Sequence, residues 1–203
     1  MSNGDSLIGI IGDSATGRAV ARHAARAGVD IVMYGRHGLD ASLVSALGSH
    51  LRAGTLAEAA EPEIVVLATP WLEISRVLAG IADWEGRILV DATNPVSQAD
   101  QMAARLSGLT SSEAVAWLAP GAHLIKAFNT LPAALLEADP LTPAGRRVLF
   151  LAGDHARAKA SVKRLIEHLG FAAIDLGTLA VGGTFIDANG GTLFGENLLR
   201  PDP

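Results

Sequence analysis

The stretch IGIIGDSATGRAV, residues 8–20, decides the fold, because it fits two different phosphate-binding loops. In the first, Gly-x-x-x-x-Gly-Lys-Ser/Thr, Gly12 and Gly17 have the correct spacing for a nucleoside triphosphate. The positions of the phosphate-binding lysine and of the magnesium-binding hydroxyl hold Arg18 and Ala19 instead. Without a magnesium ligand, phosphoryl transfer loses its main source of charge stabilisation, so this first motif is incomplete.

The second motif, Gly-x-Gly-x-x-Gly, binds the pyrophosphate of a dinucleotide. In it, Gly12 makes a tight turn and Gly17 lets the following helix pack closely on the strand, while Ser14 replaces the middle glycine. The added hydroxymethyl group narrows the approach to the pyrophosphate, but its oxygen can donate a hydrogen bond. Asp13 places a carboxylate beside the same group, where like charges repel. The candidate cofactor-binding residues of this loop are Gly12, Asp13, Ser14, Ala15, Thr16 and Gly17.

The flanking sequence favours the dinucleotide motif. Residues 7–11 (LIGII) form a short apolar run that is typical of a buried parallel strand. Residues 18–28 carry alanine and valine at helical spacing and end at Gly28, and residues 30–34 (DIVMY) are typical of a second strand. A strand, glycine turn, helix and strand within about 30 residues form the unit that the dinucleotide motif requires.

Composition excludes several classes of protein. The 203 residues suit one domain, and the hydrophobic content of 49% is that of an ordinary globular chain. A formal net charge of −5 argues against a nucleic-acid surface. No apolar run approaches the length of a membrane span, and residues 1–6 lack the basic region of a signal peptide. We therefore expect a cytoplasmic protein without nucleic-acid or membrane partners.

Thiol and metal chemistry find no support in the sequence. The absence of cysteine excludes disulfides and thiolate catalysis. The six histidines lie at positions 23, 37, 50, 123, 155 and 168. None belongs to a metal-binding pattern such as His-Glu-x-x-His, so we expect satisfied surface side chains and no metal site.

Strand and helix patterns alternate along the rest of the chain. Helices are expected near residues 39–50, 72–82, 111–119, 131–138 and 154–170, and strands near 51–55, 63–69, 87–93, 123–130, 147–153 and 171–177. Ser111 or Ser112 is placed to cap one helix, and Asp154 to cap the last one. Such alternation is typical of an α/β fold with a doubly wound, mainly parallel sheet (Rossmann fold).

The end of the chain has a different composition. Five glycines lie within residues 182–195, which indicates loops and a hairpin. No repeat or low-complexity segment interrupts the preceding alternation. We therefore expect a Rossmann-type, NADP-binding domain over residues 1–180 and a small glycine-rich C-terminal extension of the same domain over residues 181–203.

The end of the second strand indicates which dinucleotide is bound. In an open sheet of this kind, ligands lie beyond the carboxyl ends of the strands. About 20 residues beyond the glycine motif, NAD-binding proteins place an Asp or Glu that holds the adenosine ribose hydroxyls. Here that position holds Arg36, which suits a 2′-phosphate. We therefore expect NADP(H) to bind better than NAD(H), and the candidate contacts are Tyr34, Gly35, Arg36 and His37.

The carboxyl ends of three later strands carry small or polar residues that can line a cofactor cleft. These candidate residues are Ala68, Thr69, Pro70 and Trp71, then Asn94 and Pro95, then Lys126, Ala127 and Asn129. The alternative is that they only cap loops.

Together these features resemble the NADPH-dependent coenzyme F420 reductase family, the F420:NADP oxidoreductases. The resemblance rests on the glycine loop, on Arg36, and on the ordered motifs Thr-Pro-Trp (69–71), Val-Asp-Ala-Thr-Asn-Pro (90–95) and Lys-Ala-Phe-Asn-Thr (126–130). It spans about residues 7–180, and the reductase domain of the STEAP metalloreductases is similar. It implies a Rossmann domain, commonly a homodimer, that passes a hydride directly between NADPH and a deazaflavin.

The resemblance also implies roles for the matching residues. Residues 12–17 would hold the pyrophosphate and Arg36 the 2′-phosphate. Residues 69–70 and Asn94 would lie on the nicotinamide side, and residues 126–129 near the acceptor. Hydride transfer between stacked rings needs orientation and exclusion of water more than proton transfer, so we expect no catalytic acid or base.

The sequence therefore predicts an NADPH-dependent oxidoreductase with a small flavin-like acceptor, for which coenzyme F420 is the first candidate and FMN or FAD are others. A short-chain dehydrogenase is excluded, because its catalytic tyrosine precedes a lysine by four residues. Here the single tyrosine is Tyr34, and Gly38 stands at that spacing. The alternative function is a non-catalytic NADP(H)-binding sensor or partner module, since fold determines function only loosely.

Overall fold

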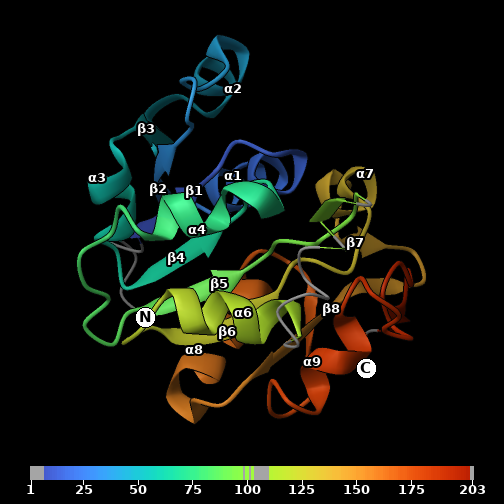
Figure 1. Ribbon diagram of the computed structural model, residues 1–203. Helices are drawn as coiled ribbons and strands as arrows, with labels where there is room; N and C mark the ends of the chain where they lie inside the picture. The colour runs from blue at the N-terminus through green and yellow to red at the C-terminus, as the bar shows by residue number, and fades with distance from the viewer. Residues whose placement is uncertain (1–6, 98, 101, 103–109, 202–203) are drawn as a thin grey trace.

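Apolar runs bounded by glycine, proline and polar turns form the strands, and amphipathic segments between them form the helices. The computed structural model describes residues 7–97, 99–100, 102 and 110–201 (Figure 1). The strands are β1 (Leu7–Ile11), β2 (Asp30–Tyr34), β3 (Leu51–Ala53), β4 (Ile64–Leu67), β5 (Ile88–Asp91), β6 (His123–Ala127), β7 (Leu141–Thr142), β8 (Gly145–Gly153), β9 (Ala172–Asp175) and β10 (Leu199–Arg200). The helices are α1 (Ala15–Arg26), α2 (Ala41–Leu47), α3 (Leu56–Ala60), α4 (Ile74–Leu78), α6 (Ser111–Leu118), α7 (Ala133–Glu137), α8 (Ala156–His168) and α9 (Gly182–Ile186), with 3₁₀ helices η1 (Gly48–His50) and η2 (Trp71–Glu73).

The strand order places the glycine loop at the centre of the sheet. Strands β3, β2, β1, β4, β5 and β6 lie side by side in that order, and all of them run parallel. This is the order of dinucleotide-binding folds, in which the sheet grows in one direction from β1 and in the other from β4. Beyond β6, β8 runs antiparallel, and β9 lies parallel to β8. The mainly parallel, doubly wound sheet predicted from the alternation is confirmed.

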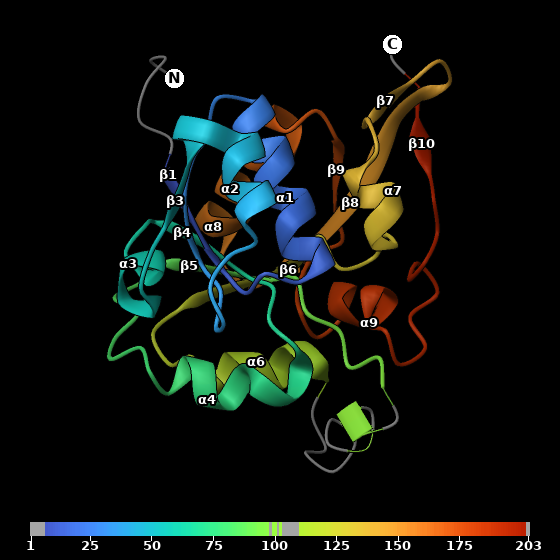
Figure 2. The ribbon, with the colours of Figure 1, turned by 90° about the horizontal axis from the view of Figure 1, so that it is seen from above.

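Alternate side chains of the central strands build two apolar layers, because successive residues of a strand point to opposite faces. Ile10 and Val66 pack in the layer that contains α1 and α8. Ile11 and Leu67, their neighbours in the chain, pack in the layer that contains α4 and α6. Figure 2 shows α4 and α6 together on the face opposite α1 and α8. In the part of the chain that the structure describes, no helix is long and apolar enough to cross a membrane.

The cap of α6 differs from the prediction. The Thr110 side chain accepts a hydrogen bond from the Glu113 amide, and the Glu113 side chain reaches back to the Thr110 amide. This capping box satisfies two amides at once, so the helix begins one residue earlier than a cap at Ser111 would allow and two residues earlier than a cap at Ser112 would allow. Both serines are buried and bind carboxylates of other segments instead.

The bounds of two other helices also correct the prediction. His155, not Asp154, precedes the first residue of α8, and the Asp154 carboxylate accepts a hydrogen bond from the Leu179 amide. The Asp154 side chain therefore binds the distant Leu179 amide instead of capping α8. The helix expected over residues 72–82 is shorter, because η2 occupies its beginning and α4 ends at Leu78.

His23 corrects the expectation that the histidines lie on the surface. It is 3% exposed on the core side of α1, and its Nε2 lies 2.7 Å from the Leu136 carbonyl oxygen. The ring packs edge-on against Phe171. Burial lowers the pKa of His23 below its ordinary value, so the neutral ring acts as a packed core side chain that ties α7 to α1.

The C-terminal tail forms a short helix and an edge strand rather than a hairpin of its own. α9 follows β9, and β10 pairs antiparallel with β8 through Leu199 and Arg147. Between them, the Gly195 amide donates to the Thr130 carbonyl oxygen at 2.8 Å. The tail is therefore folded back over β8 and over the carboxyl end of β6, which the glycine content alone does not reveal.

Gly9 is the point where α3 comes closest to the sheet, since a Cβ there would overlap the carbonyl oxygen of Ala59. We expect Gly9→Ala to lower the free energy of unfolding by about 1–3 kcal/mol, because the backbone must move. Urea unfolding followed by circular dichroism measures the change. The control is Gly183→Ala, where an added Cβ meets no atom within 4 Å. Equal effects of the two substitutions would contradict the close approach of α3.

Candidate functional site

Close packing against the end of β4 shapes the glycine loop between β1 and α1. Gly12 has a φ of +110°, which side-chain-bearing residues rarely adopt. A Cβ at Gly12 would overlap the Ala68 carbonyl group and lie 2.7 Å from the Thr69 amide nitrogen. A Cβ at Gly17 would lie 2.5 Å from the Gly12 carbonyl oxygen. The backbone therefore requires both glycines of the dinucleotide motif, and the loop fits a pyrophosphate.

Ser14 begins α1 and prepares its N-terminus for an anion. Its Oγ accepts a hydrogen bond from the Gly17 amide at 3.2 Å, and its carbonyl oxygen accepts from the Arg18 amide. The hydroxyl proton of Ser14 remains available for a ligand, because the oxygen acts only as acceptor in this contact. The first-turn amides of Ala15 and Thr16 carry the positive end of the helix dipole, which favours a phosphate group.

Asp13, which lies in the loop before α1, has a cationic neighbour in the first turn of that helix, Arg18. Arg18 Nη2 lies 3.5 Å from the Asp13 carboxylate, and Arg18 Nε donates to the Asp13 carbonyl oxygen at 2.8 Å. Both side chains are 40% exposed, so solvent screens the pair. The guanidinium offsets part of the repulsion expected between Asp13 and a pyrophosphate.

The end of β2 lies against the glycine loop, because the Gly12 amide donates to the Tyr34 carbonyl oxygen at 2.8 Å. Gly35, Arg36 and His37 follow, and the Arg36 and His37 side chains are exposed. The Arg36 guanidinium binds a carboxylate in the structure, since its Nη1 lies 2.9 Å from Glu73 Oε1. The proposed 2′-phosphate contact is therefore close to an acid from another segment.

The ends of β4 and β5 approach the loop from the other side. The Ala68 amide donates to the Ile11 carbonyl oxygen at 2.8 Å, which fixes the end of β4 beside β1. Thr69 and Pro95 are buried, whereas Pro70 is exposed. The structure thus brings the segment after β4 next to the glycine loop, as the strand order predicts.

Lys126 forms a buried ion pair with Asp91. Its Nζ lies 2.9 Å from Asp91 Oδ2 and donates to the Thr93 carbonyl oxygen at 2.6 Å, and both charged side chains are 0% exposed. The second carboxylate oxygen accepts from the Thr93 amide and hydroxyl. The structure therefore gives the Lys126 ammonium internal partners and joins the ends of β5 and β6.

Asn94 and Asn129 bind each other across the same two strand ends. Asn94 Nδ2 donates to the Asn129 carbonyl oxygen at 2.8 Å, and Asn129 Nδ2 donates to Asn94 Oδ1 at 3.1 Å and to the Ile186 carbonyl oxygen at 2.7 Å. Asn129 Oδ1 is buried and has no hydrogen-bond partner among the described residues. Phe128, just before it, has a φ of +63° although it is buried, and such backbone strain often marks functional sites.

The tail contributes a second buried carboxylate, Asp187. Its Oδ2 accepts from the Ser111 hydroxyl at 2.6 Å and from the Ser111 amide at 3.2 Å, and the Asn189 amide donates to Oδ1. Burial acts to raise the pKa of Asp187, but these hydrogen bonds outweigh it, so the pKa lies below its ordinary value. The ionised carboxylate fastens the tail to α6 beside the end of β6.

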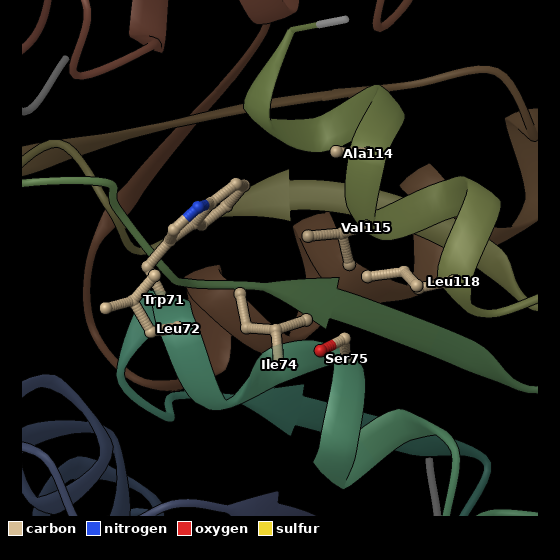
Figure 3. Close-up of a pocket in the computed structure, with 7 residues that line it drawn as sticks. All are labelled: Trp71, Leu72, Ile74, Ser75, Ala114, Val115 and Leu118. Carbon is tan, nitrogen blue, oxygen red and sulfur yellow. The ribbon is translucent and has the colours of Figure 1, made fainter. Parts of the chain in front are cut away.

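An apolar cavity of about 240 Å³ lies between the η2–α4 segment and α6. Its lining residues are Trp71, Leu72, Ile74, Ser75, Ala114, Val115 and Leu118. Figure 3 shows the side chains of Trp71 and Ile74 on one wall and those of Val115 and Leu118 on the other. Of the predicted residues, only Trp71 contributes to this cavity. The described part of the chain holds no group of three or more His, Cys, Asp or Glu side chains that could bind a metal ion.

Sequence reasoning missed Asp91, Asp187 and Glu73. A signal was available for Asp91, because it is a single acid in an apolar strand, and Lys126 is a single base in another. Charged side chains are almost never buried unless they are paired, so two isolated charges in neighbouring buried strands indicate an ion pair. Asp187 and Glu73 lie in turns and short helices, where no local pattern indicates their partners.

Known proteins resemble this chain in sequence and in fold. Residues 7–95 match the family described as NADP oxidoreductase, coenzyme F420-dependent. Metalloreductase STEAP3 from Rattus norvegicus is 31% identical over 176 residues, which cover 85% of this chain and 34% of that protein. The chain therefore spans about a third of the length of this relative.

Two solved structures cover almost the whole chain. The hypothetical protein SMa0349 from Sinorhizobium meliloti has a TM-score of 0.88 and 40% sequence identity, over 97% of this chain and 96% of that one. A candidate F420-dependent NADP reductase from Arthrobacter sp. FB24 has a TM-score of 0.65 and 23% identity, over 97% of this chain and 100% of that one. At 23% identity the second likeness shows a shared fold.

Removal of one partner of the buried ion pair should destabilise the fold strongly. We expect Lys126→Met to lower the free energy of unfolding by about 3–5 kcal/mol, because it leaves the Asp91 carboxylate buried without its cation. The double variant Asp91→Asn/Lys126→Met should regain much of this loss in urea unfolding. Arg52→Met, which removes an exposed pair with Glu58, is the control and should cost about 1 kcal/mol or less. A similar cost for both single variants would contradict a buried structural role of the pair.

Proposed function

Because residues 7–95 match the coenzyme F420-dependent NADP oxidoreductase family, we propose that this chain transfers a hydride between NADP(H) and a flavin-like acceptor. Coenzyme F420 is the first candidate acceptor, and FMN, FAD or a related ring are the others. The observation that carries the proposal is the loop of residues 12–17, where both glycines are required by packing and a serine caps the following helix.

In this proposal the chain binds the two ends of the cofactor by different means. The loop amides and the Ser14 hydroxyl hold the pyrophosphate, and Arg36 binds the 2′-phosphate by a charge-assisted hydrogen bond. At the other end, Asn129 Oδ1 is a buried acceptor without a partner among the described residues, and the nicotinamide carboxamide has N–H donors that suit it. Asn94, which binds Asn129, positions this amide.

When bound, NADPH supplies the hydride, so the chain needs to orient two rings and exclude water rather than to move a proton. Buried Thr69, Pro95 and Phe128 surround the strand ends with little access for solvent. The cavity beside Trp71 offers apolar walls against which a planar ring can pack. These features support a flat acceptor and require no catalytic acid or base.

The second candidate function is a non-catalytic NADP(H)-binding module. The observation that favours it is the loop itself, where Asp13 and Ser14 stand in positions that place a carboxylate and a side chain beside the pyrophosphate. Such a module would bind the cofactor and reduce no acceptor. Binding and turnover therefore have to be measured separately.

We also propose that the protein acts as a cytoplasmic homodimer on a small-molecule acceptor. Large exposed apolar side chains support dimerisation through this surface. Trp117 on α6 is 77% exposed, and Leu72 is 59% exposed. The net charge of −5 gives no support for a nucleic-acid partner.

Arg36→Ala should remove most of the preference for NADPH over NADH. A hydrogen bond between charged groups contributes about 1.5–3 kcal/mol, which is roughly a ten- to hundredfold difference in affinity. Titration of nicotinamide fluorescence measures the dissociation constants of both cofactors. Arg52→Ala, which removes another exposed arginine from an ion pair, is the matched control. Equal affinities of the unmutated protein for NADPH and NADH would contradict the assignment of Arg36.

Anaerobic mixing with NADPH and a panel of acceptors tests the reaction. The panel contains coenzyme F420, FMN, FAD, a quinone and a ferric chelate, and loss of the nicotinamide absorbance reports oxidation. We expect acceptor-dependent oxidation with at least one isoalloxazine-like ring and the fastest rate with F420. Tight binding of NADPH without oxidation by any member of the panel would support the non-catalytic module instead.

A further inference from the structure

Arg36 belongs to an ion triad that links two segments of the adenosine side. Glu73, the last residue of η2, places Oε1 2.9 Å from Arg36 Nη1 and Oε2 3.0 Å from Arg76 Nη2. Each carboxylate oxygen thus binds a different guanidinium. The Glu73 side chain is 28% exposed, whereas those of Arg36 and Arg76 are 45% and 53% exposed. The acid is therefore the most enclosed member of the triad.

The triad carries a net positive charge, because two guanidiniums share one carboxylate. Guanidinium groups bind carboxylates and phosphates with the same planar geometry, so a phosphate can take the place that the Glu73 carboxylate occupies. We propose that Glu73 competes with the 2′-phosphate of NADP for Arg36, and that Arg76 is a second cation of this subsite. This inference rests on the proposed function, because it assumes that Arg36 faces the adenosine end of a dinucleotide.

Arg76 gives Glu73 a partner when the phosphate takes Arg36. Glu73 and Arg76 are three residues apart, so their ion pair is local and does not depend on the position of β2. The pair between Glu73 and Arg36 joins residues 37 positions apart and holds the η2–α4 segment to the end of β2. Loss of the long-range pair therefore leaves the local pair in place, which lowers the cost of exchange.

Glu73 also places a carboxylate close to the position where NAD-binding proteins have one. Proteins that bind NAD place an acid at the end of the second strand to hold the ribose hydroxyls. This chain has Arg36 there, but Glu73 brings a carboxylate to within hydrogen-bonding distance of that arginine. Glu73 is thus a specificity-determining residue that favours NAD and opposes NADP, and Arg76 has the opposite effect.

The test is the ratio of affinities for NADP⁺ and NAD⁺ in the full chain. Isothermal titration gives both dissociation constants for the unmutated protein, Glu73→Gln and Arg76→Gln. Exposed ion pairs contribute about 0.2–1 kcal/mol, so we expect Glu73→Gln to raise the preference for NADP⁺ by up to about fivefold. Arg76→Gln should lower the preference by a similar factor. Shifts in opposite directions cannot arise from a general loss of structure.

Two controls distinguish the proposed competition from a general effect of net charge and make the test independent of acceptor reduction. Glu137→Gln removes one acid far along the chain from the triad, where Glu137 Oε1 lies 3.0 Å from Nε of the partly buried Arg22, and should leave the ratio unchanged. The probes 2′,5′-ADP and 5′-AMP differ in the 2′-phosphate and lack the nicotinamide, so they report the subsite even if no acceptor is reduced. We expect Glu73→Gln to tighten 2′,5′-ADP by up to about fivefold and to leave 5′-AMP unchanged or weaker.

Several outcomes would overturn the inference. An unchanged ratio in Glu73→Gln would show that the acid does not compete, and equal weakening of both cofactors would assign it a structural role. A ratio that moves in Glu137→Gln as it does in Glu73→Gln would assign the effect to net charge. If no acceptor of the panel is reduced, the proposed reaction is refuted. The measured affinities for NADP⁺ and NAD⁺ still test the competition between Glu73 and the 2′-phosphate.

Discussion

The close approach of the β1–α1 turn to the end of β4 is the constraint on which the site depends. Because Gly12 and Gly17 have no Cβ, the β1–α1 loop can pack against the backbone after β4, and the start of α1 can pack against the loop. The approach sets α1 against the sheet and turns its first amides toward the edge where the strands end. It also lies where the sheet divides, since β2 and β3 extend from β1 on one side and β5 and β6 from β4 on the other. Ligands of open α/β sheets bind at this division, so packing and binding depend on the same glycines.

The two ends of the candidate cleft are built from ion pairs of different kinds. At the strand ends of β5 and β6, the pair of Asp91 and Lys126 is fully buried and has further hydrogen bonds from Thr93. Such a network is costly to break, and it holds Asn94 and Asn129 in one geometry. At the proposed adenosine end, the triad around Glu73 is partly exposed and therefore weakly held. In the proposed function, a rigid nicotinamide side suits precise orientation of a ring, and an exchangeable adenosine side suits a choice between two cofactors.

Local patterns predicted the elements whose partners are close in sequence. The glycine loop, α1 and the parallel strands follow from periodicity and turn residues, and the structure contains all of them. The failures involve distant partners. Asp154 binds the Leu179 amide instead of capping α8, His23 binds Leu136, and the tail binds Thr130 and Ser111. In each case a polar group takes a partner that chain topology supplies, and no local spacing encodes that choice. Glu73 escaped notice for the same reason, because its main partner lies 37 residues away.

In the proposed function, the segment that matches the family and the segments beyond it contribute to different parts of the site. Residues 12–17 and Arg36 lie within the segment 7–95 that matches the family. One wall of the apolar cavity, formed by α6, and the tail that binds Asn129 lie beyond that segment. The relative STEAP3 shares the domain within a longer protein, of which the match covers 34%. Because fold determines function only loosely, the proposed cofactor half does not by itself fix the acceptor. Trp71 lines the apolar cavity and Glu73 binds Arg36, and both lie in the same short helix, so in the proposed function η2 connects the cofactor side to the acceptor side.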